Sequence, residues 1–349
     1  MRVAVVGVGR WGINHARVLT SLKKEGVKIA NEYIEKVLIV DKDYARAKTI
    51  ARTFQADKAL NEIEDLRAEK VDAAIIAVPT VFHYEVASRL VKETNVLVEK
   101  PLAATVEEGK KLVSLAEKEG HVLAVGHIER FNPAISLLKK ELSERKDVPN
   151  FIQAGRVGPG PKPSSTLNLG VAHDLLVHDI DITIFLVGDM PRKVKAVARY
   201  INSFPYEVDI AALFLFENNV LADLHSSWLS SSKLKDRNLR VQTNERAYNV
   251  DYITQTLQVI EGLVEHKHYS HFLDVYSRYR ARKSTTISTL SGGVEPLRLE
   301  LISYLESVVR NVEPVVSGLD GLKALMCVEK ALESAKSDGF VLIPEFSWL

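Results

Sequence analysis

The sequence is poor in cysteine, and it lacks both a long apolar run and a strong net charge. Cys327 is its single cysteine, so no disulfide can form within the chain, which suits a reducing cytosol. No apolar run reaches the roughly 18 residues that a membrane span needs, and we expect no secretory signal, because an apolar strand begins at residue 2. A formal net charge of +1 with interspersed signs gives no reason to expect nucleic acid or a membrane as partner. We expect a cytoplasmic protein.

The first third of the chain alternates strand and helix patterns. With 349 residues, 46% of them hydrophobic, the chain can bury two cores, which predicts two domains. Continuous apolar runs are typical of strands that are covered on both faces, and a doubly wound sheet binds its ligand at the carboxyl ends of such strands. We therefore expect a Rossmann domain over residues 1–126, with parallel strands at 2–6, 36–40, 72–78, 95–99 and 122–125.

The pattern changes after residue 150, where apolar and polar residues alternate over long segments. Alternation of this kind predicts strands with one buried face. We expect an α+β domain over residues 127–349 for substrate binding and oligomerisation. The exposed face of an open sheet favours a homodimer or homotetramer. The expected strands are 151–157, 192–201, 207–217, 219–228, 238–243 and 247–260, with helices at about 171–187, 296–311 and 319–336.

A Gly-x-Gly-x-x-Gly motif directly follows the first strand. Gly7 permits a sharp turn, Gly9 removes a side chain that would block a pyrophosphate, and Gly12 lets the next helix pack against the strand. The free N–H groups and dipole of that helix favour phosphate. We therefore predict a dinucleotide site that includes the intervening Arg10 and Trp11. The alternative is a glycine-rich turn that binds no ligand.

The second strand ends in Asp41. A carboxylate there accepts hydrogen bonds from the adenosine ribose and repels a 2′-phosphate, which predicts NAD as the cofactor. Asp41 lies farther beyond Gly12 than the usual spacing, and the nearby Lys42 and Arg46 leave NADP open. An exposed turn carboxylate is the alternative interpretation.

Two further strand ends carry polar residues toward the same crevice. Pro101 disfavours a helical conformation for Lys100. The Lys100 side chain can then point into the crevice and contact a reacting hydroxyl. The alternative is a polar strand exit with the lysine in solvent. The two segments are Pro79-Thr80-x-x-His83 and Glu99-Lys100-Pro101.

A polar stripe marks the expected helix at 171–187. Asp174, His178 and Asp181 are spaced i, i+4, i+7 and so share one face of a largely apolar helix. Buried aspartate and histidine need partners. A structural hydrogen-bond network is one interpretation, and a metal site that includes His173 is another. We favour an acid/base site in which His178 takes a proton and Asp174 orients its ring.

These motifs, in this order, resemble the glucose-fructose oxidoreductase, inositol dehydrogenase and rhizopine-catabolism (Gfo/Idh/MocA) family of sugar and polyol dehydrogenases. The resemblance implies that Lys100, Asp174 and His178 form the catalytic set. His178 would remove the hydroxyl proton and Lys100 would stabilise the alkoxide. The expected cofactor contacts beyond the glycine motif and Asp41 are Pro79, Thr80, His83, Glu99, Lys100 and Arg130.

A narrower resemblance lies in the segments 126–133, 227–233, 250–252 and 295–301. They are similar to the branch of that family that oxidises C3 of UDP-N-acetylglucosamine or its uronic acid with NAD. Alternatives are a dehydrogenase of a free sugar or inositol, using NAD or NADP, and a non-catalytic NAD-binding regulator. Besides Lys100 and His178, the expected substrate contacts are the cations Lys162, Lys233 and Arg237, although such clusters are often solvated faces.

Overall fold

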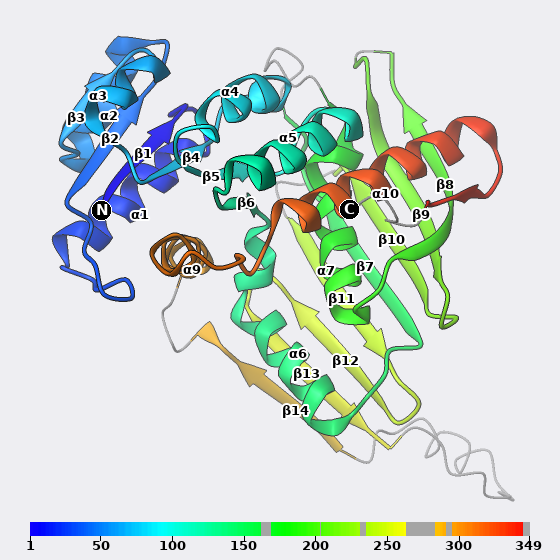
Figure 1. The fold of residues 1–349 in the computed structure, drawn as a ribbon. Coiled ribbons are helices and arrows are strands. Elements are labelled where there is room, and N and C mark those ends of the chain that lie inside the picture. The colour runs from blue at the N-terminus through cyan, green and yellow to red at the C-terminus, as the bar shows by residue number, and fades with distance from the viewer. Residues whose placement is uncertain (162–168, 203, 231–234, 263–282, 291–294, 345–349) are drawn as a thin grey trace, which may run out of the picture. The chain divides into compact units, whose positions relative to one another are not determined.

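The computed structural model describes residues 1–161, 169–202, 204–230, 235–262, 283–290 and 295–344 (Figure 1). The chain forms two compact units. The first contains residues 1–128 and 295–329, and the second contains most of the remainder, with the division inside the last long helix after Glu329. The sequence analysis expected every residue after 126 in the second domain. In the structure the segment 295–329 instead packs with the N-terminal unit.

The first unit contains a six-stranded parallel sheet with the order β3-β2-β1-β4-β5-β6. The strand order reverses between β1 and β4, which is where a doubly wound sheet opens a ligand crevice at its carboxyl ends. The strands are β1 (Arg2–Val6), β2 (Lys36–Val40), β3 (Lys58–Leu60), β4 (Ala73–Ile76), β5 (Asn95–Glu99) and β6 (Leu123–Gly126).

Two helices of this unit, α2 and α5, begin at side-chain caps. Asp43 accepts a hydrogen bond from Arg46 N at the start of α2, and Thr105 accepts one from Glu108 N at the start of α5. Gly120 ends α5 in the left-handed conformation, with φ of 71°, where glycine has no steric penalty. The helices are α1 (Gly12–Lys24), α2 (Tyr44–Phe54), α3 (Leu66–Glu69), α4 (His83–Leu90), α5 (Val106–Glu119), α9 (Pro296–Arg310) and the first part of α10 (Gly318–Ser337).

Helix α9 belongs to the core of the first unit, although it begins at Pro296 and the N-terminal part of that unit ends at Ile128. Leu301 and Tyr304 are buried in the same hydrophobic cluster as strand residues Val3 and Ile75. Ion pairs between Arg17 and Glu295 and between Arg298 and Glu25 link α9 to the region of α1. Burial of its apolar face rather than proximity in the chain therefore fixes α9.

The second unit contains a nine-stranded sheet with the order β14-β13-β12-β11-β7-β10-β9-β8-β15. All its pairings are antiparallel except that of β10 with β7. Its strands are β7 (Phe151–Val157), β8 (Pro191–Tyr200), β9 (Glu207–Phe216), β10 (Leu221–Ser227), β11 (Asp236–Gln242), β12 (Arg246–Asp251), β13 (Thr256–Glu261), β14 (Lys283–Ser288) and β15 (Val341–Leu342).

Helices pack on one face of this sheet. Helix α6 (Pro133–Arg145) contacts β12 and β13, while the π-helical turn η4 (Ala172–Leu176) and helix α7 (Val177–Val187) contact the central strands. Side chains of the opposite face, among them Val197 and Leu213 with 67% and 40% of their surface exposed, remain accessible in the described part of the chain. The polar stripe of the sequence lies on the covered side, on η4 and α7.

The fold class predicted from the sequence is confirmed: a parallel Rossmann sheet is followed by a mainly antiparallel one. Three details differ. The short strand β3 has no apolar run to announce it, the single strand expected at 247–260 is the hairpin β12–β13, and the helix expected at 171–187 begins with a π-helical turn. No helix in the described part of the chain is both long and apolar enough to cross a membrane.

Glu300 on α9 gives the first unit a pH-dependent stability. It is 2% exposed, and neither carboxyl oxygen has a hydrogen-bond partner among the described residues. Burial, reinforced by the charge of Glu99, raises the pKa of Glu300 well above its usual value. The folded state therefore holds a proton that the unfolded state releases above its normal carboxyl pKa, and stability falls as pH rises through that range.

We expect Glu300→Gln to remove this dependence. The effect should appear between the pKa of Glu300 in the unfolded state and its higher pKa in the folded state. In that range the slope of the free energy of unfolding against pH should become less negative by about 1.4 kcal/mol per pH unit. Urea titrations from pH 5 to 8 measure this, with Glu306→Gln on the same helix as control. Parallel pH profiles for the wild type and Glu300→Gln would contradict the assignment.

Candidate active site

The glycine turn after β1 has the geometry that a dinucleotide requires. Gly7 adopts φ of 85°, and a Cβ on Gly12 would lie 1.9 Å from the Gly7 carbonyl oxygen, so no other residue fits at Gly12. A Cβ on Gly9 would meet nothing within 4 Å, which leaves space in front of the turn. The turn leads directly into α1, whose first N–H groups can receive a pyrophosphate. The residues present therefore fit NAD, while Arg10 and Trp11 are exposed.

Asp41 lies at the end of β2 and is 7% exposed. Its carboxylate accepts hydrogen bonds from Val8 N at 2.9 Å and Asp43 N at 2.9 Å, and it pairs with Arg46 at 2.7 Å. Burial acts to raise the pKa of Asp41, but these hydrogen bonds outweigh it and lower the pKa. The carboxylate is thus kept ionised beside the glycine turn, and Arg46 is held by it.

The ends of β4 and β5 are linked through His83. One ring nitrogen lies 2.8 Å from the Pro101 carbonyl oxygen and the other 2.9 Å from that of Val78. His83 is 1% exposed, and burial lowers its pKa. The imidazole therefore fixes the segment that carries Lys100 against the end of β4. Pro79 and Thr80 were predicted to contact the cofactor. Pro79 caps the short helix Thr80–Phe82, which lies between β4 and His83.

Glu99, the residue before Lys100, binds a side chain from α1. Its Oε1 lies 2.6 Å from His15 Nε2, and its Oε2 accepts a hydrogen bond from Lys100 N at 3.2 Å. Both His15 and Glu99 are buried. The contact joins the helix that follows the glycine turn to the Lys100 segment, so that both parts of the predicted crevice are held in one unit.

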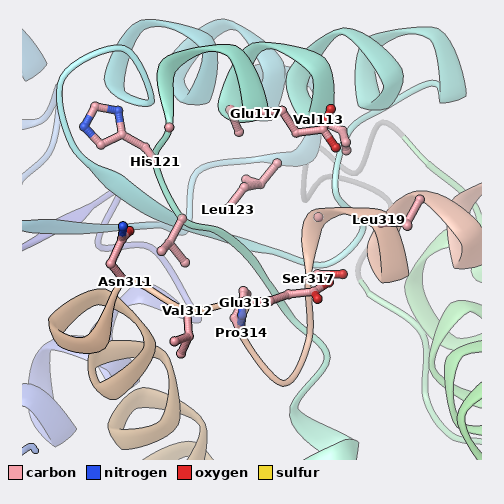
Figure 2. A pocket seen from close by; sticks show the side chains of 14 residues that line it. Val113, Glu117, His121, Leu123, Asn311, Val312, Glu313, Pro314, Ser317 and Leu319 are labelled. Carbon is pink, nitrogen blue, oxygen red and sulfur yellow. The ribbon is translucent and has the colours of Figure 1, made fainter. Parts of the chain in front are cut away.

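A surface pocket of about 450 Å³ lies elsewhere in the first unit. Figure 2 shows it between the end of α5, with Glu117 and His121, and the α9–α10 connection, with Asn311 and Pro314. It lies at the start of β6, whereas a dinucleotide binds at the carboxyl ends of the strands. None of the predicted site residues lines it.

In the second unit, Asp174 lies on η4 and His178 on the first turn of α7. The N–H of Ala172, at the start of η4, donates to buried Glu207 Oε1 at 3.0 Å. A Cβ on Gly170 would lie 2.0 Å from that same oxygen, so the approach requires glycine. A carboxylate at a helix start interacts favourably with the helix dipole. Glu207 thus fixes the beginning of the segment that carries Asp174 and His178.

The Asp174 carboxylate is bound by a tryptophan. Trp228 Nε1 donates to Asp174 Oδ2 at 3.3 Å. The indole packs edge-on against Phe204 with ring centroids 5.3 Å apart, and a Cβ on Gly160 would lie 2.7 Å from Trp228 Cβ. Trp228, only 7% exposed, therefore has a fixed position from which it orients Asp174.

The third member of the stripe, Asp181, is a structural ion-pair partner. Its carboxylate forms a two-pronged pair with Arg130, with distances of 2.6 and 2.9 Å, and both side chains are buried. The Arg130 guanidinium also stacks on Phe185 at 5.0 Å. Arg130, predicted to contact the cofactor, is thus placed in the second unit beside α7.

A second buried guanidinium lies under the same helix. Arg156, 1% exposed, donates to Asp179 Oδ1 at 2.9 Å and Glu129 Oε1 at 2.8 Å, and it stacks on Tyr252 at 4.5 Å. Although burial alone lowers the pKa of Arg156, the charges of Asp179 and Glu129 raise it overall. Burial raises the pKa of Asp179 to about 6 despite Arg156. Asp179 directly follows His178, so this network anchors the turn that carries it.

Sequence reasoning did not identify this network, Trp228 as a partner of Asp174, or Glu207 as a cap. One signal was present: Arg156 follows Ile152 and Ala154 at the inward positions of an alternating strand, where a charged residue requires a buried partner. Its partners Asp179 and Glu129 come from distant segments, and no pattern in the sequence indicates that they pair with Arg156. Of the predicted basic contacts, Lys162 and Lys233 lie outside the described residues, and Arg237 lies on β11. Among the described residues no cluster of His, Cys, Asp and Glu has the arrangement of a metal site.

Comparison with known proteins gives consistent matches over most of the chain. Residues 1–127 match a family model described as an oxidoreductase family with an NAD-binding Rossmann fold, and residues 155–247 match the GFO/IDH/MocA C-terminal domain. UDP-N-acetylglucosamine 3-dehydrogenase of Acidithiobacillus ferrooxidans is 31% identical over 74% of this chain and 76% of its own length. A scyllo-inositol 2-dehydrogenase (NAD(+)) of Bacillus subtilis is 27% identical over 65% and 67%.

Among solved structures, levoglucosan dehydrogenase in complex with NADH and levoglucosan has a TM-score of 0.86 at 18% identity, covering 99% of this chain and 100% of that one. At this identity the likeness concerns the fold alone. The fold comparison thus agrees with the architecture of this chain, while the family models and the sequence relatives identify an NAD-binding dehydrogenase family.

We expect Trp228→Phe to lower the free energy of unfolding by about 1–3 kcal/mol, because it removes the indole N–H that donates to the partly buried Asp174 carboxylate. Urea denaturation measures the loss. Trp11→Phe is the matched control, since Trp11 is 41% exposed and its change should stay within about 0.5 kcal/mol. In an Asp174→Ala background Trp228→Phe should cost less. Equal costs in both backgrounds would show that the indole acts only by packing.

Proposed function

The chain belongs to the Gfo/Idh/MocA oxidoreductase family, and on that premise we propose that it oxidises C3 of UDP-N-acetylglucosamine or its uronic acid to a ketone. At the coarser level it is an NAD-binding dehydrogenase of a family that acts on sugar and polyol hydroxyls. The observation that carries the proposed chemistry is Asp174, bound by Trp228 Nε1 at 3.3 Å, four residues before His178. The sugar is inferred from the 31% identical relative.

The proposed catalytic residues are Lys100, Asp174 and His178. His178 takes the C3 hydroxyl proton on an imidazole nitrogen, and Asp174 orients the ring and stabilises its protonated form. Lys100 donates a hydrogen bond from Nζ to the oxygen as negative charge develops. A positioned base of this kind contributes about 10²- to 10⁴-fold to the rate. NAD, when bound, accepts the hydride.

The proposed cofactor contacts come from the first unit and from Arg130. Gly9 N–H and the start of α1 hold the pyrophosphate, and Asp41 accepts hydrogen bonds from the ribose hydroxyls and disfavours a 2′-phosphate. His83 and Glu99 hold the walls of the crevice through their buried contacts. The full proposed set is Gly7, Gly9, Arg10, Trp11, Gly12, Asp41, Pro79, Thr80, His83, Glu99, Lys100 and Arg130.

The proposed substrate contacts are Lys100, Lys162, His178, Lys233 and Arg237. Inositol or a free sugar is the second candidate substrate, because inositol 2-dehydrogenases are also among the relatives. Either substrate uses the same proton and hydride chemistry, so the choice between them depends on contacts outside the catalytic set.

We also propose a cytoplasmic homo-oligomer in which residues 1–126 bind NAD and residues 127–349 bind substrate and the partner copy. The face of the nine-stranded sheet opposite α6 and α7 carries exposed Val197, Leu213 and Leu221, and apolar side chains on an exposed sheet face are typical of an association surface. Size-exclusion chromatography with light scattering measures the mass, and a monomer at micromolar concentration would contradict this arrangement.

The substrate proposal is tested with a panel of UDP-N-acetylglucosamine, its uronic acid, N-acetylglucosamine and myo-inositol. The UDP-linked sugars should react with the highest kcat/KM, because binding energy from the remote nucleotide positions C3. Mass spectrometry identifies the 3-keto product, and deuterium at C3 should appear in the reduced cofactor. Exclusive oxidation of myo-inositol would move the chain to another branch of the family.

In the same assay, His178→Ala and Lys100→Ala should each lower kcat at least about 100-fold with little change in NAD affinity. Asp174→Asn should cost less, since the imidazole remains in place. The exposed Lys118→Ala on α5 serves as control. Undiminished turnover by His178→Ala would exclude the proposed base.

Asp41 gives a separate prediction on cofactor choice. The wild type should prefer NAD to NADP, and Asp41→Ala should narrow the ratio of kcat/KM values by about tenfold or more, because ribose hydrogen bonds are lost and Arg46 is released from its pair with Asp41. Asp43→Ala removes the cap of α2 and should lower stability without changing the ratio. A wild type that prefers NADP would refute this role.

A further inference from the structure

Two arginines lie side by side on the helix-covered face of the second unit's sheet. Arg237 on β11 is paired in register with Arg156 on β7. Paired residues of neighbouring strands point to the same face, and Arg156 is buried under α7, where it binds Asp179. The sheet therefore places two guanidinium groups next to each other at the level of the turn that carries His178 and Asp179.

The two guanidinium groups differ in how well they are neutralised. Arg156 is 1% exposed and binds two carboxylates at 2.8 and 2.9 Å. The Arg237 side chain is 33% exposed, and within the described residues the only carboxylate oxygen within 4 Å of it is Glu129 Oε1, at 3.9 Å. That oxygen is already the acceptor for Arg156 at 2.8 Å. Arg237 is thus a partly buried cation whose planar group of donors has no close carboxylate of its own.

Arg237 interacts electrostatically with the carboxylates on both sides of His178 in the sequence. Burial lowers the pKa of Arg237, and so does the charge of Arg156. The charges of Glu129, Asp174 and Asp179 oppose this effect. His178 lies between the last two in sequence. Because Arg237 pairs in register with Arg156, which binds Asp179 directly after His178, a group bound by Arg237 would lie on the side of the sheet that carries the proposed base.

We propose that Arg237 selects an anionic sugar: its guanidinium binds an oxyanion, a carboxylate or a phosphate, attached to the ring whose hydroxyl is oxidised. This inference rests on the proposed function and adds to it the residue that excludes neutral polyols. A guanidinium matches the two oxygens of a carboxylate or phosphate with two parallel N–H bonds. A neutral ring that displaced water from Arg237 would leave the charge without compensation, which lowers its affinity.

The test compares Arg237→Met with the wild type in binding and turnover. Arg237→Met should raise the KM for UDP-N-acetylglucosamine or its uronic acid about 10- to 100-fold, since charged hydrogen bonds are lost, with a smaller change in kcat. Calorimetric titration with the same two compounds, in the presence of NADH, should show the same loss of affinity without any turnover. Arg237→Lys should recover only part of it, because lysine keeps the charge and loses the planar pair of donors.

Arg240→Met is the matched control. Arg240 lies on the same strand and is exposed, and the alternation of β11 turns it to the opposite face of the sheet. Thermal unfolding of each variant identifies loss of the fold, in which case the Arg237→Lys variant carries the test. The control should bind both nucleotide sugars as the wild type does.

The substrate arms identify the oxyanion. A larger loss for the uronic acid than for UDP-N-acetylglucosamine assigns the carboxylate, whereas equal losses for these two, shared by N-acetylglucosamine 1-phosphate, assign the phosphate. An equal loss with neutral N-acetylglucosamine, or no loss with any compound, would overturn the role of Arg237. Absence of wild-type turnover on every sugar would instead refute the proposed function, and the calorimetric comparison would still decide whether Arg237 binds the anion.

Discussion

The second unit depends on one buried guanidinium, that of Arg156. Its bonds to Asp179 and Glu129 connect the central strand β7 with the start of α7 and the segment before α6. Loss of one partner of such a buried pair typically costs about 3–5 kcal/mol, because the other charge is left without compensation. The same bonds anchor the turn that carries His178, while the pairing of β11 with β7 places Arg237 next to Arg156. Stability and the placement of the proposed catalytic and substrate-binding groups therefore rest on one set of contacts.

In the first unit a comparable role falls to short contacts around the carboxyl ends of the strands. Asp41 holds the glycine turn through Val8 N, and Glu99 joins the helix after that turn to the Lys100 segment through His15. Each carboxylate thus connects two strand ends or a strand end and a helix. The crevice is held by buried polar contacts before any ligand is present, so that less conformational entropy is lost when a dinucleotide binds.

Much of the fold is predictable from local patterns. The parallel strands other than β3 appear as apolar runs, the glycine motif specifies the first turn, and Thr105 and Gly120 mark the ends of α5. These features depend on residues close in the chain. The packing of α9 in the first core and the ion pairs of Arg156 were not predictable. They join segments separated by long stretches of sequence, and one sequence records no pairing between distant charges. The ion pair of Asp181 with Arg130 was not predictable for the same reason, although Asp181 was expected on one helix face with Asp174 and His178.

The dinucleotide turn, the order of the two sheets and the family to which the chain belongs could all be inferred from the amino-acid sequence. Those properties follow from glycine conformational freedom, hydrophobic periodicity and short motifs. The partners of the polar side chains on η4 and α7 became apparent only from the packing of distant segments. The packing binds Asp174 to Trp228, and among the described residues the ion-pair partner of Arg237 is Glu129, 3.9 Å away. The physical reason is that burial and partner geometry, which set the energy of a charge, exist only once distant segments have packed together.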